Sequence, residues 1–476
     1  MPLVAGVDTS TQATKVVVVD AETGSVVARG RAAHEVTGTG GARETDPEVW
    51  WRALREALAR SEQAPHIAAI SVAGQQHGLV VLDENGTPVR PAKLWNDTES
   101  AEDARLLVDA FGGPSWWAER MGLVPVASFT ATKWAWLKRV EPDAAGATRA
   151  IRLPHDFITE RLTGAGVTDR GDVSGTAWWS TATEGYAHEV LEHPSQRLDP
   201  SLLPDVLGPV DIAGEVTAEA AEYLGLQQGI PVGPGTGDNA GAAVGLGLVP
   251  GLPVISLGTS GTAFMSSAVR TVDPSGGVAG FADATGRFLP LAATLNCTLA
   301  VDRIAGWLGL DRDAVTDHCS VVVLPYLDGE RTPNLPNAAA SIIGLRHATE
   351  PGEILLAAYQ GAALSLLEAL DVIDEHSSGI DADAPIVLIG GGARGATWQR
   401  VVRSLSGRAL QIPEATEVVA LGAAVQAAAV LRSEALDVIA GRWDTRRGLV
   451  LEPVERDAAT VERIREVRTL LTEVNT

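Results

Sequence analysis

Apolar runs separated by polar turns open this chain, and they predict strands. Residues 3–20, LVAGVDTSTQATKVVVVD, contain an apolar run, a polar turn and a run of valines. Continuous β-branched runs of this kind are typical of strands covered on both faces. We expect another strand over 25–32, a strand over 66–74 that ends in glycine, and a hairpin over 79–89 around Asn85 and Gly86.

The apolar spacing changes to that of helices in two longer segments. Residues 47–62 and 353–373 repeat apolar positions every three or four residues, which predicts amphipathic helices. Residues 252–267 repeat the strand, turn and strand of the chain's start, and 384–395 read as a strand that runs into glycines before a helix. Two halves with one plan indicate an internal duplication.

The length of the chain agrees with a division into two, because 476 residues exceed what one compact core usually holds. We place the break near 245–252, which gives an N-terminal domain over 1–246 and a C-terminal domain over 247–476. The segment GPGTGDNAGAAVG at 233–245 ends at this break. A glycine-rich segment in this place can serve both as a hinge and as the wall of a site.

Composition and charge narrow the classes of function. The chain is 45% apolar and 20% charged, and its formal net charge is −23. Such an acidic balance argues against a nucleic-acid or anionic-membrane partner. No apolar run approaches the roughly 20 residues of a membrane span, and the start MPLVAGVDTS lacks the pattern of a signal peptide. We therefore expect a cytoplasmic protein, for which monomer and homodimer both stay open.

Cysteine and histidine give no metal-binding pattern. Cys297 and Cys319 are predicted to be small core residues with reduced thiols. In HEVLEH, at 188–193, the histidines are five residues apart, whereas two ligands on one helix face are four apart. We expect no zinc site there.

Four turns rich in glycine or hydroxyl groups each follow an apolar strand. They lie at 8–11, 237–239, 258–261 and 390–394. Glycine lets the backbone approach a ligand, and successive N–H groups with Ser or Thr hydroxyls bind phosphate well. One such turn is ordinary, but four at strand ends indicate a phosphate site. None matches the GxxxxGK[ST] or GxGxxG patterns, so the standard nucleotide-binding loops are disfavoured.

Two of these turns contain an acid, and phosphoryl transfer needs acids of two kinds. Asp8 suits a role near Mg²⁺, through water, or it closes its turn as an Asx residue. Asp238 suits a general base that accepts the proton of the attacking hydroxyl, or it caps a helix over 239–248, and both roles are compatible. Asn239 can bond a neighbouring hydroxyl.

These residues, in this order, resemble the FGGY carbohydrate kinases over residues 3–430, and most closely the members that phosphorylate xylulose. The first phosphate loop of the family, D-x-G-T-x-x-x-K, matches 8–15 with Ser10 in the glycine position. Further matching segments are GQQHG at 74–78, LWND at 94–97, SFTATK at 128–133, GTGDNAGAAVG at 235–245, LGTSG at 257–261, PYLDGERTP at 325–333 and GGGARG at 390–395. Gly344 and Leu345, followed by a helix, match the family signature.

The resemblance implies an α/β fold of two ribonuclease-H-like domains, of the actin-like ATPase class, with ATP and sugar in the cleft between them. It implies phosphorylation of a pentulose with ATP and Mg²⁺. D-xylulose is the first expectation, and ribulose, another ketose or a polyol are alternatives. A non-catalytic sugar-sensing or nucleotide-sensing protein on the same fold is the rival from another class.

The resemblance also assigns residues. Asp238 is the general base, and Asp8 helps to position the metal ion. The cofactor residues are Thr11, Lys15, Gly258, Thr259, Ser260, Gly391, Gly392 and Ala393, of which the last three lie under the adenosine.

The sugar side is assigned to Gln76, His77 and Asn239, together with Trp95 and Asp97. A neutral imidazole offers one donor and one acceptor to sugar hydroxyls, although His77 is alternatively a structural histidine. Trp95 either covers sugar C–H groups or only packs. Asp97 either bonds sugar hydroxyls or caps the helix that follows.

Two departures from the family pattern concern different properties. Ser10 replaces glycine where the backbone approaches phosphate, so it reshapes the loop without removing the groups that bind. Gln76 replaces methionine in the sugar pocket, so it bears on the choice of sugar.

Overall fold

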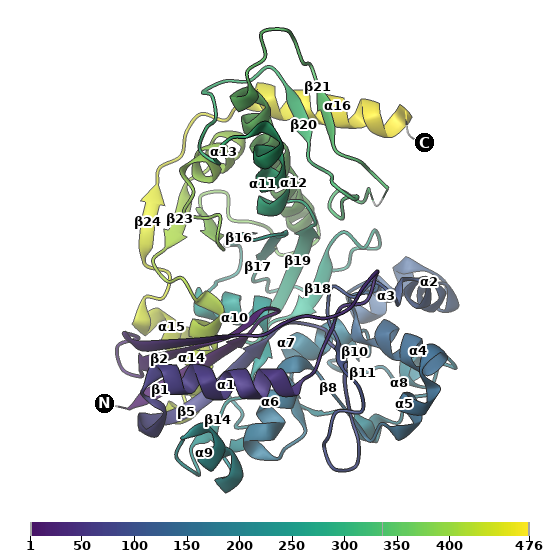
Figure 1. The fold of residues 1–476 in the computed structure, drawn as a ribbon, viewed down its shortest axis with the longest axis vertical. Helices are drawn as coiled ribbons and strands as arrows, with labels where there is room; N and C mark the ends of the chain where they lie inside the picture. Colours follow the sequence, from purple (N-terminus) through teal and green to yellow (C-terminus); the bar gives the residue numbers. More distant parts are fainter. Residues whose placement is uncertain (1, 336, 475–476) are drawn as a thin grey trace.

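The computed structural model describes residues 2–335 and 337–474, and its two halves each contain a seven-stranded sheet (Figure 1). The first sheet has the order β13-β14-β5-β1-β2-β3, with β15 paired to β5. Its strands are β1 Leu3–Thr9, β2 Ala13–Asp20, β3 Val26–Ala33, β5 Ile67–Gly74, β13 Gly214–Glu215, β14 Pro231–Val232 and β15 Thr236–Gly237. The second sheet has the order β18-β19-β17-β16-β22-β23-β24. Its strands are β16 Pro253–Leu257, β17 Gly261–Met265, β18 Ala279–Ala282, β19 Phe288–Thr294, β22 Ile386–Ile389, β23 Leu410–Pro413 and β24 Gly448–Leu451.

The duplication expected from the sequence is visible in strand direction. In the first sheet β1, β2 and β3 are antiparallel neighbours, and β5 runs parallel to β1 on its other side. In the second sheet β16, β17 and β19 repeat this arrangement, and β22 runs parallel to β16. The β1–β2 turn and the β16–β17 turn are therefore topologically equivalent.

Helices cover both sheets, and the predicted ones form with small shifts of their ends. The helix expected over 47–62 is α1 Glu48–Ser61, and the one expected over 353–373 is α12 Pro351–Glu375. The other helices used below are α2 Ala101–Ala110, α6 Pro154–Thr163, α10 Asp238–Gly245, α11 Thr298–Leu308, α13 Ala396–Ser406, α14 Val418–Arg432, α15 Leu436–Trp443 and α16 Ala458–Val474.

The expected hairpin over 79–89 forms only in part. The chain does turn back there, since Asp83 N–H donates to the Thr87 carbonyl. The strand β6 Val80–Leu82, however, pairs with the distant strand β8 Ala150–Arg152. β6 keeps contacts of the expected hairpin, since Val89 N–H donates to the Val81 carbonyl and Leu82 bridges Pro88, and it gains β8 in addition.

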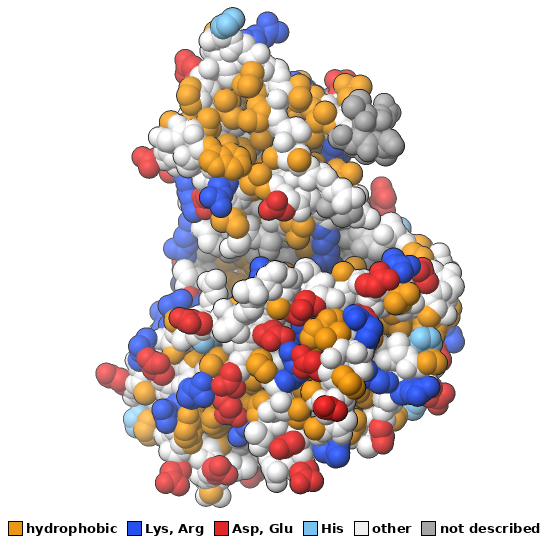
Figure 2. Space-filling view, turned by 45° about the vertical axis from the view of Figure 1, so that its right-hand side comes forward, with side chains coloured by type: hydrophobic (Ala, Val, Ile, Leu, Met, Phe, Trp, Pro, Cys, Tyr) orange, Lys and Arg blue, Asp and Glu red, His pale blue; other side chains and the backbone are white. Residues whose placement is uncertain are grey.

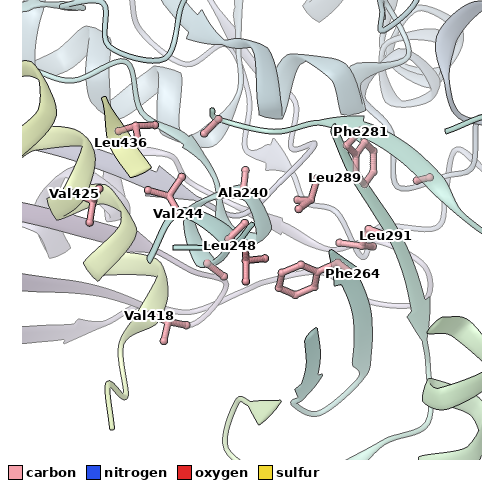
Figure 3. Close-up of a cluster of buried hydrophobic side chains, with 14 of the residues drawn as sticks. Ala240, Val244, Leu248, Phe264, Phe281, Leu289, Leu291, Val418, Val425 and Leu436 are labelled. Carbon is pink, nitrogen blue, oxygen red and sulfur yellow. The ribbon is translucent and has the colours of Figure 1, made fainter. Parts of the chain in front are cut away.

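Each half has its own apolar core, and a third core joins them. One buried cluster draws on residues 5–232 and another on residues 255–464. The shared cluster contains Val244 and Leu248 after the first sheet, Phe264 and Leu289 of the second sheet, and Val418 at the start of α14 (Figure 3). The two halves are thus in contact through a shared apolar core.

The expected boundary at 246–247 separates the two sheets in the sequence. The helix α14, however, follows the boundary in sequence and packs on the sheet that precedes it. α14 lies in the second half of the sequence and packs against β1, β2 and β5 of the first sheet, while α15 packs against α10. The first domain is therefore completed by residues from the second half.

α10 and α14 touch through their backbones. A Cβ on Gly422 would lie 1.9 Å from the Gly241 carbonyl oxygen, and one on Gly245 would lie 2.0 Å from that of Val418. In the same way a Cβ on Gly6 of β1 would meet the Ala420 carbonyl at 1.9 Å. Only glycine permits this approach, and it fixes the start of α10 relative to both domains.

Among the described residues, α12 is long and apolar enough to cross a membrane by length and composition alone, and α14 with α15 passes the same test only as a bent pair. The α12 window has a mean hydropathy of 1.3, but 78% of it is buried inside the protein. α12 packs against α11, α13 and the second sheet, as a core helix does. In the first half of the chain, the HEVLEH segment at 188–193 forms the short helix α8 His188–Leu191.

We predict that Gly422→Ala lowers thermal stability clearly, because the added methyl group would force two backbones apart. Overpacking of a rigid contact typically costs ~1–3 kcal/mol. Differential scanning calorimetry would measure the Tm.

The matched control is Gly441→Ala in α15, where a Cβ meets nothing within 4 Å. A helical Gly→Ala change without a clash is expected to be neutral or stabilising by up to ~1 kcal/mol. Equal Tm changes in the two variants would contradict the close-packing argument.

Candidate functional site

Two adjoining cavities lie between the domains, where the surface is hollowed at the waist of the molecule (Figure 2). The first, of about 240 Å³, is lined by Gln76, His77, Trp95, Asp238 and Asn239 from the first half, and by residues of β16–β19 and Arg331 from the second. The second, of about 220 Å³, is lined by Asp8, Lys15, Asp238, Asn239, Gly390 and Glu417, among others. Asp238 and Asn239 line both, so the two cavities meet at the start of α10.

Asp238 is the first residue of α10, and the N-cap position belongs to Gly237. The N–H and the side-chain amide of Asn239 donate to Asp238 Oδ1 at 2.8 and 2.9 Å. Burial, followed by the nearby Asp8 carboxylate, raises the pKa of Asp238 to about 7, against the hydrogen bonds from Asn239. A carboxylate with this pKa can accept a proton at neutral pH.

Gln76 continues the same chain of contacts. Its Oε1 accepts the Asn239 amide at 2.6 Å, while its buried Nε2 has no hydrogen-bond partner in the described residues. A Cβ on Gly237 would lie 2.6 Å from the Gln76 side chain, so this glycine makes room for it. Gln76 therefore brings an amide donor without a protein partner to the wall of the cavity.

His77 lies deep in the first cavity with a left-handed backbone, φ 62°. Its ring contacts Phe129 and Phe281, with centroid distances of 5.2 and 5.1 Å. Burial, and then the charges of Lys133 and Arg331, lower the pKa of His77 well below its usual value. The imidazole is therefore neutral, which suits it to hydrogen bonding with an uncharged ligand.

Trp95 joins the first cavity to the first phosphate turn. It is 37% exposed and lines the cavity, and its indole N–H donates to Thr11 Oγ1 at 3.1 Å. Thr11 Oγ1 in turn lies 3.4 Å from the Gln75 Oε1 that accepts from it.

Asp97 does not reach the cavity, contrary to the sugar-contact alternative. Its Oδ2 accepts from Lys93 Nζ and Arg43 N–H, both at 2.9 Å, and its Oδ1 accepts from Glu99 N–H. It does not cap the following helix either, because α2 begins after Ser100. The buried ammonium of Lys93 binds this carboxylate, and the backbone N–H of Arg43, 54 residues earlier in the sequence, helps to hold it in place.

Lys93 also fills the one cluster of carboxylates among the described residues that has the spacing of a metal site. Glu44, Asp97 and Glu99 approach one another within 4.8 Å, but Lys93 Nζ lies 2.6–3.3 Å from all three. The cluster is an ion-pair network built around a lysine.

The β1–β2 register places Asp8 directly opposite Lys15, and the two side chains pair at 3.3 Å. Lys15 also pairs at 2.8 Å with Glu417, the residue before α14. Burial raises the pKa of Asp8 to about 6, although Lys15 opposes the rise. Asp8 Oδ1 is buried without a hydrogen-bond partner in the described residues, so it is free to hold a cation or its water.

The β16–β17 turn contributes differently at its three predicted positions. Ser260 lines the first cavity, whereas the carbonyls of Gly258 and Thr259 accept hydrogen bonds from Thr298 and Leu299 at the start of α11. The two turn carbonyls are therefore anchored, and the turn is rigid.

The third glycine turn follows β22. Gly390 lines the second cavity, and the predicted residues Gly391, Gly392 and Ala393 follow it without lining either cavity. A Cβ on Gly391 would meet nothing within 4 Å, while Gly392 packs on Leu257 and Ala393 is buried. Gly391 thus offers an open backbone face beside the cavity.

Sequence reasoning missed Ser256, Glu417 and Arg331. Ser256 lines both cavities but stands inside a strand with no polar neighbours to mark it. Glu417 and Arg331 come from segments more than 300 residues away from Asp8 and Lys15. The PYLDGERTP segment was the available signal for Arg331, and it had been matched without a role.

His155 of α6 is a buried cation behind the first cavity. Its Nε2 lies 3.1, 3.4 and 3.4 Å from the carboxylates of Asp156, Asp169 and Asp172. Burial by itself would lower the pKa of His155, but these carboxylates outweigh it and raise the pKa to about 9. His155 is therefore an imidazolium at neutral pH.

The His155 cluster reaches both functional loops. Asp172 Oδ1 accepts the His77 backbone N–H at 3.4 Å, and Asp169 Oδ2 accepts the Thr236 hydroxyl at 2.8 Å, two residues before Asp238. The cluster positions the histidine and the aspartate relative to each other.

A larger open hollow, of about 820 Å³, lies between β3 and α1. It contains none of the glycine turns and no residue predicted for the site, so the chemistry is assigned to the two interdomain cavities.

Comparison with known proteins gives consistent matches over the whole chain. The N-terminal domain model of the FGGY family of carbohydrate kinases matches residues 3–245, and the C-terminal domain model matches residues 254–431. A protein of Streptomyces coelicolor named xylulose kinase is 60% identical over 465 residues, which are 97% of this chain and 95% of that one.

Solved structures agree. A xylulose kinase from Bifidobacterium adolescentis has a TM-score of 0.84 and 36% identity, and covers 98% of this chain and 99% of its own. A gluconate kinase from Lactobacillus acidophilus has a TM-score of 0.88, 20% identity, and covers 99% and 97%. The second likeness shows the fold alone.

We predict that kcat/KM for the sugar rises with pH and levels off above about pH 7. The reason is that Asp238 accepts a proton only when ionised, and its pKa is raised to about 7. Below that value the rate should fall about tenfold for each pH unit. A steady-state pH profile measures this, and a flat profile between pH 5 and 8 would contradict it.

We predict a pH-dependent contribution of His155 to stability. Its folded pKa is raised to about 9 from an unfolded value near 6.5. The stabilisation is complete below pH 6.5 and is lost as the pH rises through about 9. The Tm of the wild type should therefore fall more between pH 6.5 and 9.5 than that of His155→Gln, and parallel curves would contradict the role.

The variant should also be less stable at pH 7, because three carboxylates lose their shared cation. His155→Gln combined with Asp156→Asn removes one of those charges and should recover part of the lost Tm. The exposed His188→Gln serves as the control for loss of a histidine.

Proposed function

The chain belongs to the FGGY family of carbohydrate kinases, and from this premise we propose that it transfers the γ-phosphoryl group of ATP to the terminal hydroxyl of D-xylulose. It has the two-domain α/β fold of that family, of the actin-like ATPase class. It is a kinase whose acceptor is a hydroxyl group, and its substrates are a sugar and ATP.

The observation that carries the proposal is the position of Asp238 at the junction of two cavities. On one side it shares a cavity with the free amide of Gln76 and the neutral imidazole of His77. On the other side it shares a cavity with Asp8 and Lys15. A base at this point contacts a hydroxyl that faces a phosphate, as transfer between two bound molecules requires.

The proposed reaction assigns one role to each side chain at the junction. Asp238 accepts the proton of the C5 hydroxyl as that oxygen attacks the γ-phosphorus in line with the leaving ADP oxygen. Asn239 holds the Asp238 carboxylate through two hydrogen bonds. Gln76 donates to a sugar oxygen, and His77 offers one ring nitrogen as donor or acceptor.

The phosphate side is proposed to hold ATP with Mg²⁺. The free Oδ1 of Asp8 supports its role as the group that would hold the ion or its water, and the ion would screen phosphate charge. Lys15 lies beside Asp8 and would shift its ammonium to the phosphates. Thr11, Thr259 and Ser260 are proposed as further phosphate contacts, and Gly391, Gly392 and Ala393 as the adenosine wall.

The choice of sugar rests on relatives. The 60% identical protein of Streptomyces coelicolor and the 36% identical structure from Bifidobacterium adolescentis are both named xylulose kinase, which supports D-xylulose. A gluconate kinase has the same fold, so the fold by itself does not select the sugar. Ribulose and polyols are therefore the alternatives, and Gln76 is the pocket residue on which the choice turns.

We further propose a cytoplasmic location. The two cysteines, Cys297 and Cys319, are both free thiols, as is usual in a reducing compartment.

The test is ADP release from Mg-ATP with D-xylulose, L-xylulose, D-ribulose, L-ribulose, glycerol and gluconate, ranked by kcat/KM. The maximum is expected with D-xylulose. Asp238→Asn should lower kcat with the best sugar at least about 100-fold while ATP still binds, because it removes the base. A maximum with another sugar would contradict D-xylulose as the substrate and leave the kinase activity standing. Absence of turnover with every sugar would contradict the proposed kinase activity itself.

A further inference from the structure

Arg331 is the one residue lining the first cavity that carries a permanent positive charge, and it comes from the second domain. The other polar groups of that cavity that contact a sugar in the proposed function, Gln76, His77 and Asn239, come from the first domain. A guanidinium therefore faces them across the cleft.

The loop that presents Arg331 is fixed to the end of β19. The Glu330 carboxylate accepts the backbone N–H of Leu295 at 2.5 Å and the Asn296 side-chain amide at 3.1 Å. Asn296 also donates to the Gly329 carbonyl at 2.7 Å, and the Thr332 hydroxyl donates to Ala293 at 2.9 Å. The backbone on both sides of Arg331 is thus held by hydrogen bonds.

The Arg331 guanidinium does not pair with the neighbouring Glu330. The Glu330 carboxylate accepts hydrogen bonds from backbone and side-chain amide N–H groups instead. Within residues 2–335 and 337–474, no hydrogen bond or ion pair of the Arg331 side chain is found. Burial lowers the pKa of Arg331, and no carboxylate opposes the effect. Arg331 is half-buried and lines the cavity, so a guanidinium without a protein partner is available there to a ligand.

The position along the cavity indicates which part of a ligand it meets. Arg331 and His77 line the first cavity and are not among the residues that line the second, whereas Asp238 lines both. Arg331 therefore lies on the sugar side of the junction, away from the phosphate side where the hydroxyl reacts.

We propose that Arg331 donates hydrogen bonds to sugar oxygens remote from the reacting hydroxyl, so that the bound sugar bridges the two domains. A guanidinium has five N–H donors and no acceptor, which matches the carbonyl and hydroxyl oxygens of a ketose. The inference rests on the proposed function, because it takes a sugar to be the occupant of the first cavity.

The bridge couples sugar binding to closure of the cleft. Without sugar, no hydrogen bond among the described residues connects Arg331 of the second domain to Gln76, His77 and Asn239 of the first. With sugar, the rigid loop of Arg331 gains contacts that exist only when the domains are together. The second domain, which holds the nucleotide turns, is thereby drawn toward the acceptor before transfer, and water is excluded from the phosphates.

The test compares Arg331→Gln, Arg331→Lys and the wild type with the sugar that the wild type prefers. Loss of a charge-assisted hydrogen bond should raise the sugar KM at least about tenfold in Arg331→Gln, with a smaller rise in Arg331→Lys. The KM for ATP should stay within about twofold. Small-angle scattering should show that sugar alone compacts the wild type and fails to compact Arg331→Gln.

The matched control is Arg346→Gln, an exposed arginine of the same domain for which neither KM is expected to change. Thermal unfolding and ADP binding show that each variant is folded. If Arg331→Gln does not fold, the Lys variant with its retained charge carries the comparison.

An unchanged sugar KM in Arg331→Gln would overturn the proposal. A lower kcat with unchanged sugar KM would overturn it too, because that result assigns the guanidinium to the phosphate. Failure of the proposed function is distinguishable, since it shows in the wild type as a different preferred sugar, on which Arg331 is then tested.

Discussion

The contact between α10 and α14 is the constraint on which the rest of the site depends. Gly241, Gly245 and Gly422 let the two helix backbones meet without side chains between them. α10 begins with Asp238, and α14 begins after Glu417, so this contact sets the distance between the base and the partner of Lys15. Because the helices join both halves of the chain, the junction of the two cavities cannot move far from the shared core.

The protonation of the acids in the site depends on their burial and their ion pairs more than on the net charge of the chain. The chain carries an excess of acids, and several of those in and beside the cleft share a cation. Asp8 and Glu417 share Lys15, and the three carboxylates behind the first cavity share His155. Asp238 has no ion-pair partner among the described residues, and burial, followed by the Asp8 carboxylate, raises its pKa to about 7. This pKa suits Asp238 to accept a proton at neutral pH.

Much of the fold could be predicted because it is local. The runs at 3–20 and 252–267 became paired strands, since their apolar pattern and polar turns lie within a few residues of each other. The register that sets Asp8 opposite Lys15 follows from the same turn. Asp97, for which a sugar contact and a helix cap were both open, lines neither cavity, because a buried lysine and a distant backbone N–H hold its carboxylate. Arg331 and His155 were not predicted for a related reason. Their surroundings are formed by residues on separate elements, which the spacing of residues in the sequence does not reveal.

The equivalence of the β1–β2 and β16–β17 turns has a consequence for the symmetry of the molecule. A dimer of one identical half would bring two identical turns to its cleft, with the same charge on either side. Here the halves are joined in one chain, so the turns differ. The first holds Asp8 and Lys15 at its ends, whereas the second, from Gly258 to Gly261, contains no charged residue. Covalent fusion thereby gives the cleft a polarity, and a linear, asymmetric triphosphate has one preferred direction in which to lie.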